Sequence, residues 1–235
     1  MNPIIVVTGG SKGIGRAVVE KFAAEGFDII TCARTEADLV QLQTDIQSRY
    51  EGITVHPKAI DLSSKSAILA WVEEIQALHR PVEVLVNNAG VFAAGQTYNE
   101  PDGLLENLIA TNLYSAYHLT RGLIDSMITQ HRGHIFNLCS VASIMAYPNG
   151  GGYSISKFAL YGLSKALREE LKPYGIRVTA ILPGATLTPS WDGVNLPQER
   201  FIKPEDIAES IWATYRLSER TVVEEIVIRP LLGDL

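Results

Sequence analysis

Seven short apolar runs, separated by longer amphipathic segments, are the feature of this sequence that most restricts its fold. The runs are rich in β-branched residues and nearly continuous, which is typical of parallel strands covered by helices on both faces. They are Ile4–Thr8, Asp28–Ala33, Ile53–Ile60, Val82–Val86, His134–Ser140, Arg177–Leu182 and Val222–Ile228. Between them, apolar residues recur at helical spacing. This alternation predicts an α/β fold with one doubly wound parallel sheet of about seven strands and helices on both faces.

The 235 residues show no Pro/Ser-rich linker, internal repeat or low-complexity tract. We therefore expect a single Rossmann-type domain over residues 1–235. Helical and strand periods both fade only between residues 184 and 203. A loop of that length inside a compact domain is usually functional, so 184–203 is predicted to be a substrate loop or lid.

Charge and composition argue against some partners and locations. The net charge of -6 and the pI of about 5.4 disfavour nucleic acid or an anionic membrane. The opening MNPIIVVTGG lacks the basic region of a signal peptide, and no apolar stretch approaches the roughly 18 residues that span a membrane. Cys32 and Cys139 lie in apolar runs. They are predicted to be buried free thiols, which fits an expected cytoplasmic location.

A glycine-rich turn joins the first apolar run to the first helical segment. In VVTGGSKGIGRAVVEKF the glycines Gly9, Gly13 and Gly15 follow a Gly-x-x-x-Gly-x-Gly spacing. Glycine lets the backbone approach a pyrophosphate, and the following helix N-terminus offers N–H donors. Lys12 precedes Gly13, so the Gly-Lys-Ser/Thr ending of a phosphate-loop NTPase is absent. The motif favours a dinucleotide site, with an ordinary tight turn as the alternative.

Six motifs together resemble the short-chain dehydrogenase/reductase family, in its order and at its usual intervals. They are TGGSKGIG at 8–15, NNAG at 87–90, Asn112 in ATNLYSA, Ser140 in IFNLCSVAS, YSISK at 153–157 and PGATLT at 183–188. The resemblance covers essentially the whole chain. It implies an oxidoreductase that moves a hydride between a nicotinamide cofactor and a carbonyl or alcohol.

The end of the second apolar run indicates which nicotinamide cofactor is used. An acid at this point would bind the ribose 2′-hydroxyl and repel a 2′-phosphate. Here Ala33 is followed by Arg34 and Thr35, with Lys12 and Ser11 in the glycine turn on the same side. Two cations and two hydroxyls suit a phosphate dianion. We predict NADP(H) over NAD(H); the alternative is that both cations are solvated surface charges.

The resemblance extends the expected cofactor site to other motifs. Asp61 and Leu62 would lie beside the adenine, although Asp61 could instead start a turn before a helix capped by Ser63 or Ser64. The full set expected to bind the cofactor is Gly9, Ser11, Lys12, Gly13, Ile14, Gly15, Arg34, Thr35, Asp61, Leu62, Asn88, Ala89, Gly90, Tyr153, Lys157, Pro183, Gly184 and Thr188.

Tyr153 and Lys157 stand one helical turn apart. Free tyrosine has a pKa near 10, and a nearby cation lowers it. By resemblance Tyr153 is the proton donor, Lys157 tunes it and holds the nicotinamide ribose, Ser140 orients the carbonyl, and Asn112 anchors a water in a proton relay. Tyr-x-x-x-Lys pairs are common by chance, but the four residues in register with the cofactor motifs predict catalysis.

The expected substrate pocket involves Ser140, Tyr147, Tyr153 and Trp191. With Met145 they suggest an aromatic-lined site for a planar or bulky carbonyl; the alternative is that some pack in the core or a subunit interface. The glycines at 150–152 are predicted to make the pocket wall mobile or to admit a wide substrate.

Two narrower resemblances compete for the substrate. The tail looks like bacterial sepiapterin-reductase-like members, and the body resembles 3-oxoacyl-carrier-protein reductases. The latter generally carry a basic residue where Tyr174 stands, so an NADPH-dependent reductase of small ketones or diketones is favoured. A dinucleotide-binding scaffold without catalysis is the remote alternative.

The remaining expectations concern metal binding, the exposure of two histidines and assembly with other copies of the chain. The five histidines form no metal-binding motif, so no metal is predicted. His131 and His134 flank the Arg132-Gly133 turn and are expected to be exposed. The resemblance implies a homodimer or homotetramer that packs the helices containing Asn112 and Tyr153 against partner copies.

Overall fold

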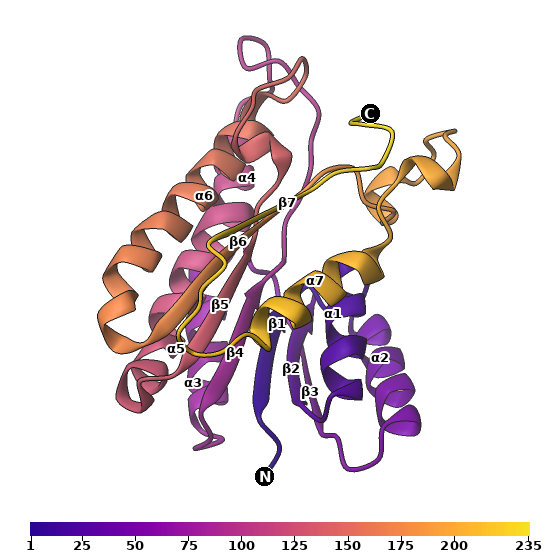
Figure 1. Ribbon diagram of the computed structural model, residues 1–235. Coiled ribbons are helices and arrows are strands. Elements are labelled where there is room, and N and C mark those ends of the chain that lie inside the picture. Colours follow the sequence, from indigo (N-terminus) through magenta and orange to yellow (C-terminus); the bar gives the residue numbers. More distant parts are fainter.

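The computed structural model describes residues 1–235 and is built around one seven-stranded parallel sheet (Figure 1). Its strands are β1 (Ile4–Thr8), β2 (Asp28–Ala33), β3 (Val55–Ala59), β4 (Val82–Asn87), β5 (Gly133–Leu138), β6 (Ile176–Pro183) and β7 (Glu225–Ile228). The strand order is β3-β2-β1-β4-β5-β6-β7, so the chain reverses direction across the sheet between β1 and β4. The predicted doubly wound α/β fold is confirmed. In such sheets, ligands bind at the carboxyl ends of the strands beside this reversal.

Helices cover both faces of the sheet. They are α1 (Gly13–Ala24), α2 (Glu36–Arg49), α3 (Lys65–Gln76), α4 (Leu104–Ile109), α5 (Ser115–Gln130), α6 (Gly151–Leu171) and α7 (Pro204–Tyr215). Short turns are the π-helical η1 (Ala110–Tyr114) and the 3-10 helices η2 (Val141–Ser143), η3 (Lys172–Tyr174), η4 (Pro189–Trp191) and η5 (Gln198–Arg200). None of the helices is both long and apolar enough to cross a membrane.

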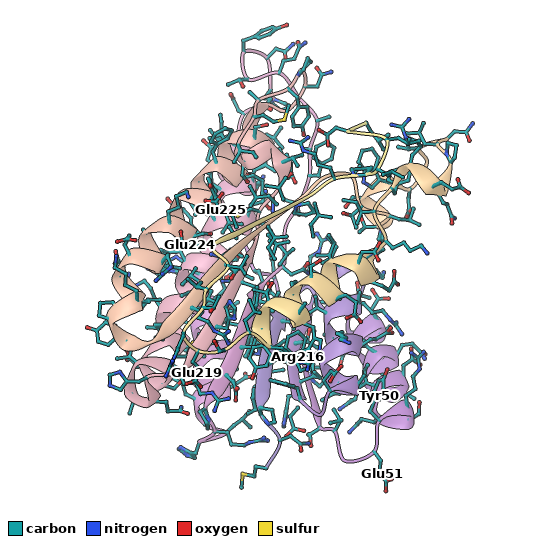
Figure 2. The ribbon with its side chains drawn as sticks, in the orientation of Figure 1. Tyr50, Glu51, Arg216, Glu219, Glu224 and Glu225 are labelled. Atoms are coloured by element: carbon teal, nitrogen blue, oxygen red, sulfur yellow. The ribbon has the colours of Figure 1, made fainter.

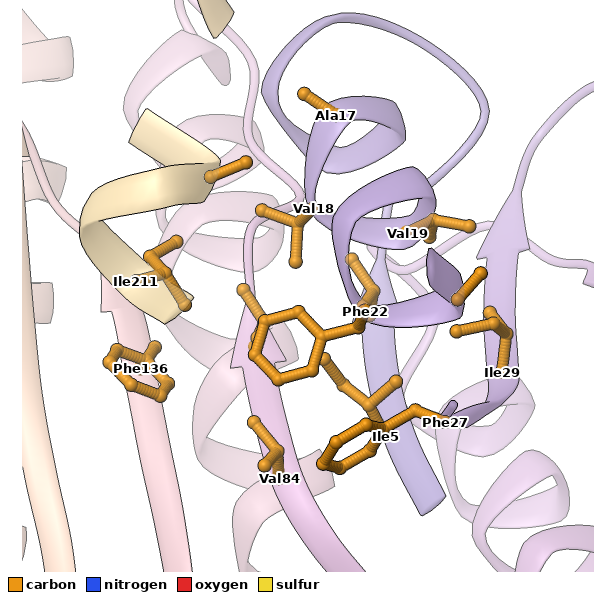
Figure 3. Packing of buried hydrophobic residues seen from close by; sticks show 14 of the residues in the cluster. Ile5, Ala17, Val18, Val19, Phe22, Phe27, Ile29, Val84, Phe136 and Ile211 are labelled. Carbon is orange, nitrogen blue, oxygen red and sulfur yellow. The ribbon is translucent and has the colours of Figure 1, made fainter. Parts of the chain in front are cut away.

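Each face of the sheet has its own apolar core. On one face, α1, α2 and α7 contribute to a cluster of 22 buried residues; Figure 3 shows Phe22 of α1 among Phe27, Ile211 and Val84. On the other face, a cluster of 19 buried residues joins the strands to α3 and α5. Because alternate side chains of a strand enter opposite cores, the strands are apolar throughout.

Strand limits differ from prediction where local hydrogen bonds intervene. β1 and β2 have the predicted bounds. β5 ends at Leu138 instead of continuing to Ser140, because Ser140 caps η2 and its Oγ accepts a hydrogen bond from Ala142 N at 3.1 Å. β7 starts only at Glu225. This edge strand is tied to α6 by an ion pair between Lys165 and Glu225, and Figure 2 shows Glu225 beside α6.

The expected exposure of His134 is wrong. The strand already begins at Gly133, so His134 lies within the ladder, fully buried. Its Nε2 lies 2.8 Å from Thr179 Oγ1, its ring stacks on Phe136, and burial lowers its pKa well below the ordinary value. His131 is exposed as expected. Cys32 and Cys139 are buried free thiols, which confirms their prediction.

Candidate active site

A cavity of about 750 Å³ opens at the carboxyl ends of the strands, the upper edge of the sheet in Figure 1. It runs from the glycine turn after β1 to the segment after β6. Every residue predicted to bind cofactor or substrate, or to act in catalysis, lines it, apart from Gly15 and Asn112. The structure therefore gathers side chains from motifs spread over most of the chain into one site.

The glycine turn is shaped by close backbone contacts. Gly9 and Gly13 have φ of +67° and +53°, in the left-handed region that favours glycine. A Cβ on Gly15 would lie 2.2 Å from the Gly9 carbonyl oxygen, so a glycine is needed where the start of α1 packs against the turn. Asn88 Nδ2 donates to Thr8 O at 2.8 Å and to Gly9 O at 3.2 Å. The end of β4 thus holds the turn open toward the cavity.

The two predicted cations differ in their surroundings. Lys12 Nζ lies 2.7 Å from Asp38 Oδ2, and Asp38 also lines the cavity. Arg34 makes no ion pair or side-chain hydrogen bond and is exposed. Thr35 lies next to it, at the N-terminus of α2. Arg34 is therefore the cation left available to an anionic group at this end of the cavity.

Asp61 lies in a turn at the edge of the cavity. It lines the cavity, and its Oδ1 accepts hydrogen bonds from Ser63 N and Ser63 Oγ, both at 2.9 Å. These bonds lower the pKa of its carboxyl group. Ser64 Oγ accepts from Ala67 N and caps α3. The turn alternative accounts for Oδ1, while the position of the residue still allows contact with a ligand.

Tyr153 and Lys157 occupy the first two turns of α6 and face the same end of the cavity as Ser140. Lys157 is 5% exposed, and its Nζ donates to Leu138 O at 2.7 Å. Nζ lies 5.8 Å from the centre of the Tyr153 ring. A Cβ on Gly90 would lie 3.3 Å from Asn112 Oδ1 and 3.4 Å from Nζ, so the backbone of Gly90 passes close to both side chains.

Burial dominates the electrostatics of this pair. It lowers the pKa of Lys157 from 10.5 to about 8. It raises the pKa of the Tyr153 hydroxyl, and the adjacent Ser140 hydroxyl offsets part of that rise. The expected lowering of the Tyr153 pKa by Lys157 is therefore wrong: the pKa is raised, and burial is the largest cause. A tyrosine that stays protonated at neutral pH is in the form that a proton donor needs.

Asn112 stands apart from the cavity. The helix expected to contain Asn112 is interrupted by the π-helical turn η1, where Asn112 is 1% exposed. Its Oδ1 accepts from Val91 N at 2.8 Å, and its Nδ2 donates to Val91 O and to Ser156 Oγ. The side chain therefore joins the segment after β4 to α6, directly behind Lys157. π-helical turns of this kind are frequent at functional sites.

Aromatic side chains also line the cavity. Tyr147 and Trp191 line it as predicted, and Trp191 packs on Phe201 with ring centres 5.1 Å apart. Sequence reasoning missed Phe92, whose ring meets that of Tyr153 edge-on at 4.9 Å. Its position two residues after NNAG could have indicated it. Asp234, also missed, reaches the cavity from the C-terminal tail, for which the sequence carries no local signal.

Comparison with known proteins adds independent information. The family model described as short chain dehydrogenase matches residues 3–199. A sepiapterin reductase of Chlorobaculum tepidum is 34% identical over 100% of this chain and 99% of its own length. A metagenomic short-chain oxidoreductase in complex with NADP has a TM-score of 0.85 and 32% identity, covering 98% of each chain. A single-residue variant of the actinorhodin polyketide ketoreductase with NADPH has a TM-score of 0.89 and 26% identity, covering 100% of this chain and 98% of its own.

Proposed function

The chain belongs to the short chain dehydrogenase family, and we propose that it is an NADPH-dependent carbonyl reductase. The observation that carries the proposal is one cavity with two ends. At one end lies the open glycine turn, and at the other Ser140, Tyr153 and Lys157 converge. This arrangement fits a dinucleotide laid along the cavity, with its nicotinamide beside Tyr153.

The residues divide the chemistry between them. A bound nicotinamide supplies the hydride that reaches the carbonyl carbon. The Tyr153 hydroxyl donates the proton to the carbonyl oxygen, and the Ser140 hydroxyl orients that oxygen by a hydrogen bond. Lys157, held by Leu138 O, would place a cation behind the tyrosine as its proton leaves and would hold the nicotinamide ribose. Asn112, whose side chain is bonded to Val91 and Ser156, ties the segment after β4 to α6 beside this pair, and its part in a proton relay stays a prediction.

Several observations support NADPH over NADH. β2 ends without an acid, Arg34 stands unpaired at that end of the cavity, and the two structural relatives described above hold NADP or NADPH. Arg34→Asp is expected to lower kcat/KM for NADPH by about tenfold or more, because one charge-assisted phosphate contact is replaced by repulsion. It should also improve kcat/KM for NADH.

Initial rates with each cofactor measure this change. Arg220→Asp is the matched control, since Arg220 is exposed, makes no ion pair and lies in the turn after α7. The control should leave the NADPH/NADH preference within about twofold. Equal KM values for both cofactors in the wild type, or equal effects of the two variants, would contradict the assignment.

For the substrate we propose a planar or bulky ketone or diketone. Tyr147, Trp191 and Phe92 provide aromatic walls, and the segment 184–203 provides a lid. Its ends are joined by hydrogen bonds from Leu187 N to Ile202 O and from Ile202 N to Ala185 O, both 2.9 Å, while residues 192–199 are exposed. The sepiapterin reductase similarity over the whole chain supports this class.

The likeness to a polyketide ketoreductase favours the alternative, a 3-oxoacyl-carrier-protein reductase. A panel of diketones, pteridines with side-chain carbonyls and acetoacetyl thioesters separates the two, with cofactor absorbance as the readout. We expect the highest kcat/KM with a diketone or pteridine. A higher value with the thioester would favour the alternative, and binding of NADPH without turnover of any carbonyl would favour a scaffold.

We also propose assembly into a homodimer or homotetramer. Tyr114 and Tyr117, in η1 and α5, and Ile155 and Phe158, on α6, are large apolar side chains that remain at least 36% exposed. Contiguous exposure of this kind marks interaction surfaces. Light scattering should give a mass of two or four chains, and a monomer at micromolar concentration would contradict the proposal.

A further inference from the structure

Two of the three glycines before Tyr153, Gly151 and Gly152, leave room for a carboxylate from a distant part of the chain. Glu100 lies between β4 and α4, and its Oε1 accepts a hydrogen bond from Gly152 N at 2.8 Å. A Cβ on Gly151 would lie 1.9 Å from Glu100 Oε1, and one on Gly152 would lie 2.9 Å from Oε2. Gly151 and Gly152 therefore have a steric reason that does not depend on mobility or substrate width.

The backbone of the same segment also meets the start of α6. Gly95 N donates to Asn149 O at 3.0 Å, and Gly95 forms an isolated parallel bridge with Gly150. A Cβ on Gly95 would lie 2.8 Å from Glu100 Cγ. Figure 1 shows the two loops side by side above α6. Glu100 supplies the only side-chain hydrogen bond between residues 92–103 and α6.

The segment held in this way carries Phe92 into the substrate end of the cavity. Phe92 is 50% exposed and lines the cavity, and its ring contacts that of Tyr153 edge-on, with an interplanar angle of 83°. Edge-to-face pairs have a preferred geometry, so a shift of the segment changes both the contact and the shape of the wall.

We propose that Glu100 is a positioning residue: it fastens the segment 92–103 to the first turn of α6 and thereby fixes Phe92 as one wall of the substrate site. The consequence for kinetics rests on the proposed carbonyl reduction. The fastening itself is a property of the fold and can be measured without turnover.

Kinetics of single and double variants test whether Glu100 shapes the substrate site through Phe92. Glu100→Ala is expected to raise KM for the preferred carbonyl about tenfold, because a small displacement of a substrate wall is costly, with KM for NADPH little changed. Glu100→Gln keeps an oxygen acceptor for Gly152 N and should restore most of the loss. Phe92→Ala should raise KM as well, and adding Glu100→Ala to it should change KM no further, because both act through one wall.

Glu106→Ala is the matched control, since Glu106 is exposed in the first turn of α4 and makes no ion pair or side-chain hydrogen bond. It should leave KM unchanged. An unchanged KM in Glu100→Ala would overturn the inference that Glu100 acts on the substrate site through Phe92. Effects of Glu100→Ala and Phe92→Ala that multiply in the double variant would overturn it as well.

Hydrogen exchange of the backbone amides tests the fastening directly. Glu100→Ala should speed exchange at Gly152 and across residues 92–103, while Glu106→Ala should not. Unchanged exchange in Glu100→Ala would overturn the inference whether or not the enzyme turns over. A wild type that reduces no carbonyl but shows the exchange difference would refute the proposed function and leave the fastening in place.

Discussion

Tyr153→Phe should lower kcat for carbonyl reduction by about 10³-fold while leaving the Kd for NADPH within about twofold, since a general acid contributes roughly 10² to 10⁴. The variant removes only the hydroxyl group. The ring that packs edge-on against Phe92 is retained, and Lys157 keeps its hydrogen bond to Leu138 O. The loss should therefore fall on kcat, because the missing proton transfer occurs only in the transition state.

The measurement is steady-state kinetics with the preferred carbonyl, together with NADPH binding by fluorescence. Tyr161→Phe is the matched control, because Tyr161 lies two turns further along α6 and does not line the cavity. It should keep wild-type kcat. The assignment of Tyr153 as proton donor fails if its variant keeps more than about a tenth of wild-type kcat, or if both variants lose activity equally.

Lys157→Met should abolish turnover and yet stabilise the folded protein at pH 7. Burial lowers the pKa of Lys157 from 10.5 to about 8, so keeping the charge inside costs about 3 kcal/mol below pH 8. Loss of the hydrogen bond to Leu138 O offsets about 1 kcal/mol of the gain. The variant should thus have a free energy of unfolding about 2 kcal/mol higher than the wild type at pH 7.

The sign of the pH dependence follows from proton uptake. Below pH 8 the lysine is protonated in both states, and the full cost is present. Between pH 8 and pH 10.5 the unfolded state binds more protons, so wild-type stability rises relative to the variant, and above that range the cost is gone. Urea unfolding at pH 7 and pH 9.5 measures the difference. A gap that does not narrow with pH, or a variant less stable at pH 7, would contradict burial of a charged lysine.

The elements best predicted from sequence are those whose signal is local. β1 and β2 are continuous apolar runs ended by turn residues, and their bounds were predicted without error. The end of β5 was predicted two residues too late, because Ser140 leaves the strand to cap η2. The side-chain period could not reveal that the helix around Asn112 contains a π-helical turn, since the apolar stripe continues through it.

Long-range contacts account for the remaining differences. His134 was expected at an exposed turn, but its burial depends on the neighbouring strand β6, which supplies Thr179. The reason for Gly151 and Gly152 was equally hidden, because Glu100 lies 52 positions before Gly152. The motifs located the lining of the site, while the ion pair of Lys12 depended on Asp38, a side chain that no motif contains.

Transfer of deuterium from [4,4-²H₂]NADPH tests the central claim most directly. The protein is incubated with this cofactor and the preferred carbonyl, and the product is analysed by mass spectrometry. We predict that the wild type gives an alcohol with a single deuterium on the former carbonyl carbon, and that Tyr153→Phe binds the cofactor but forms almost none of it. An unlabelled alcohol, or no alcohol from any carbonyl of the panel although NADPH binds, would contradict the account.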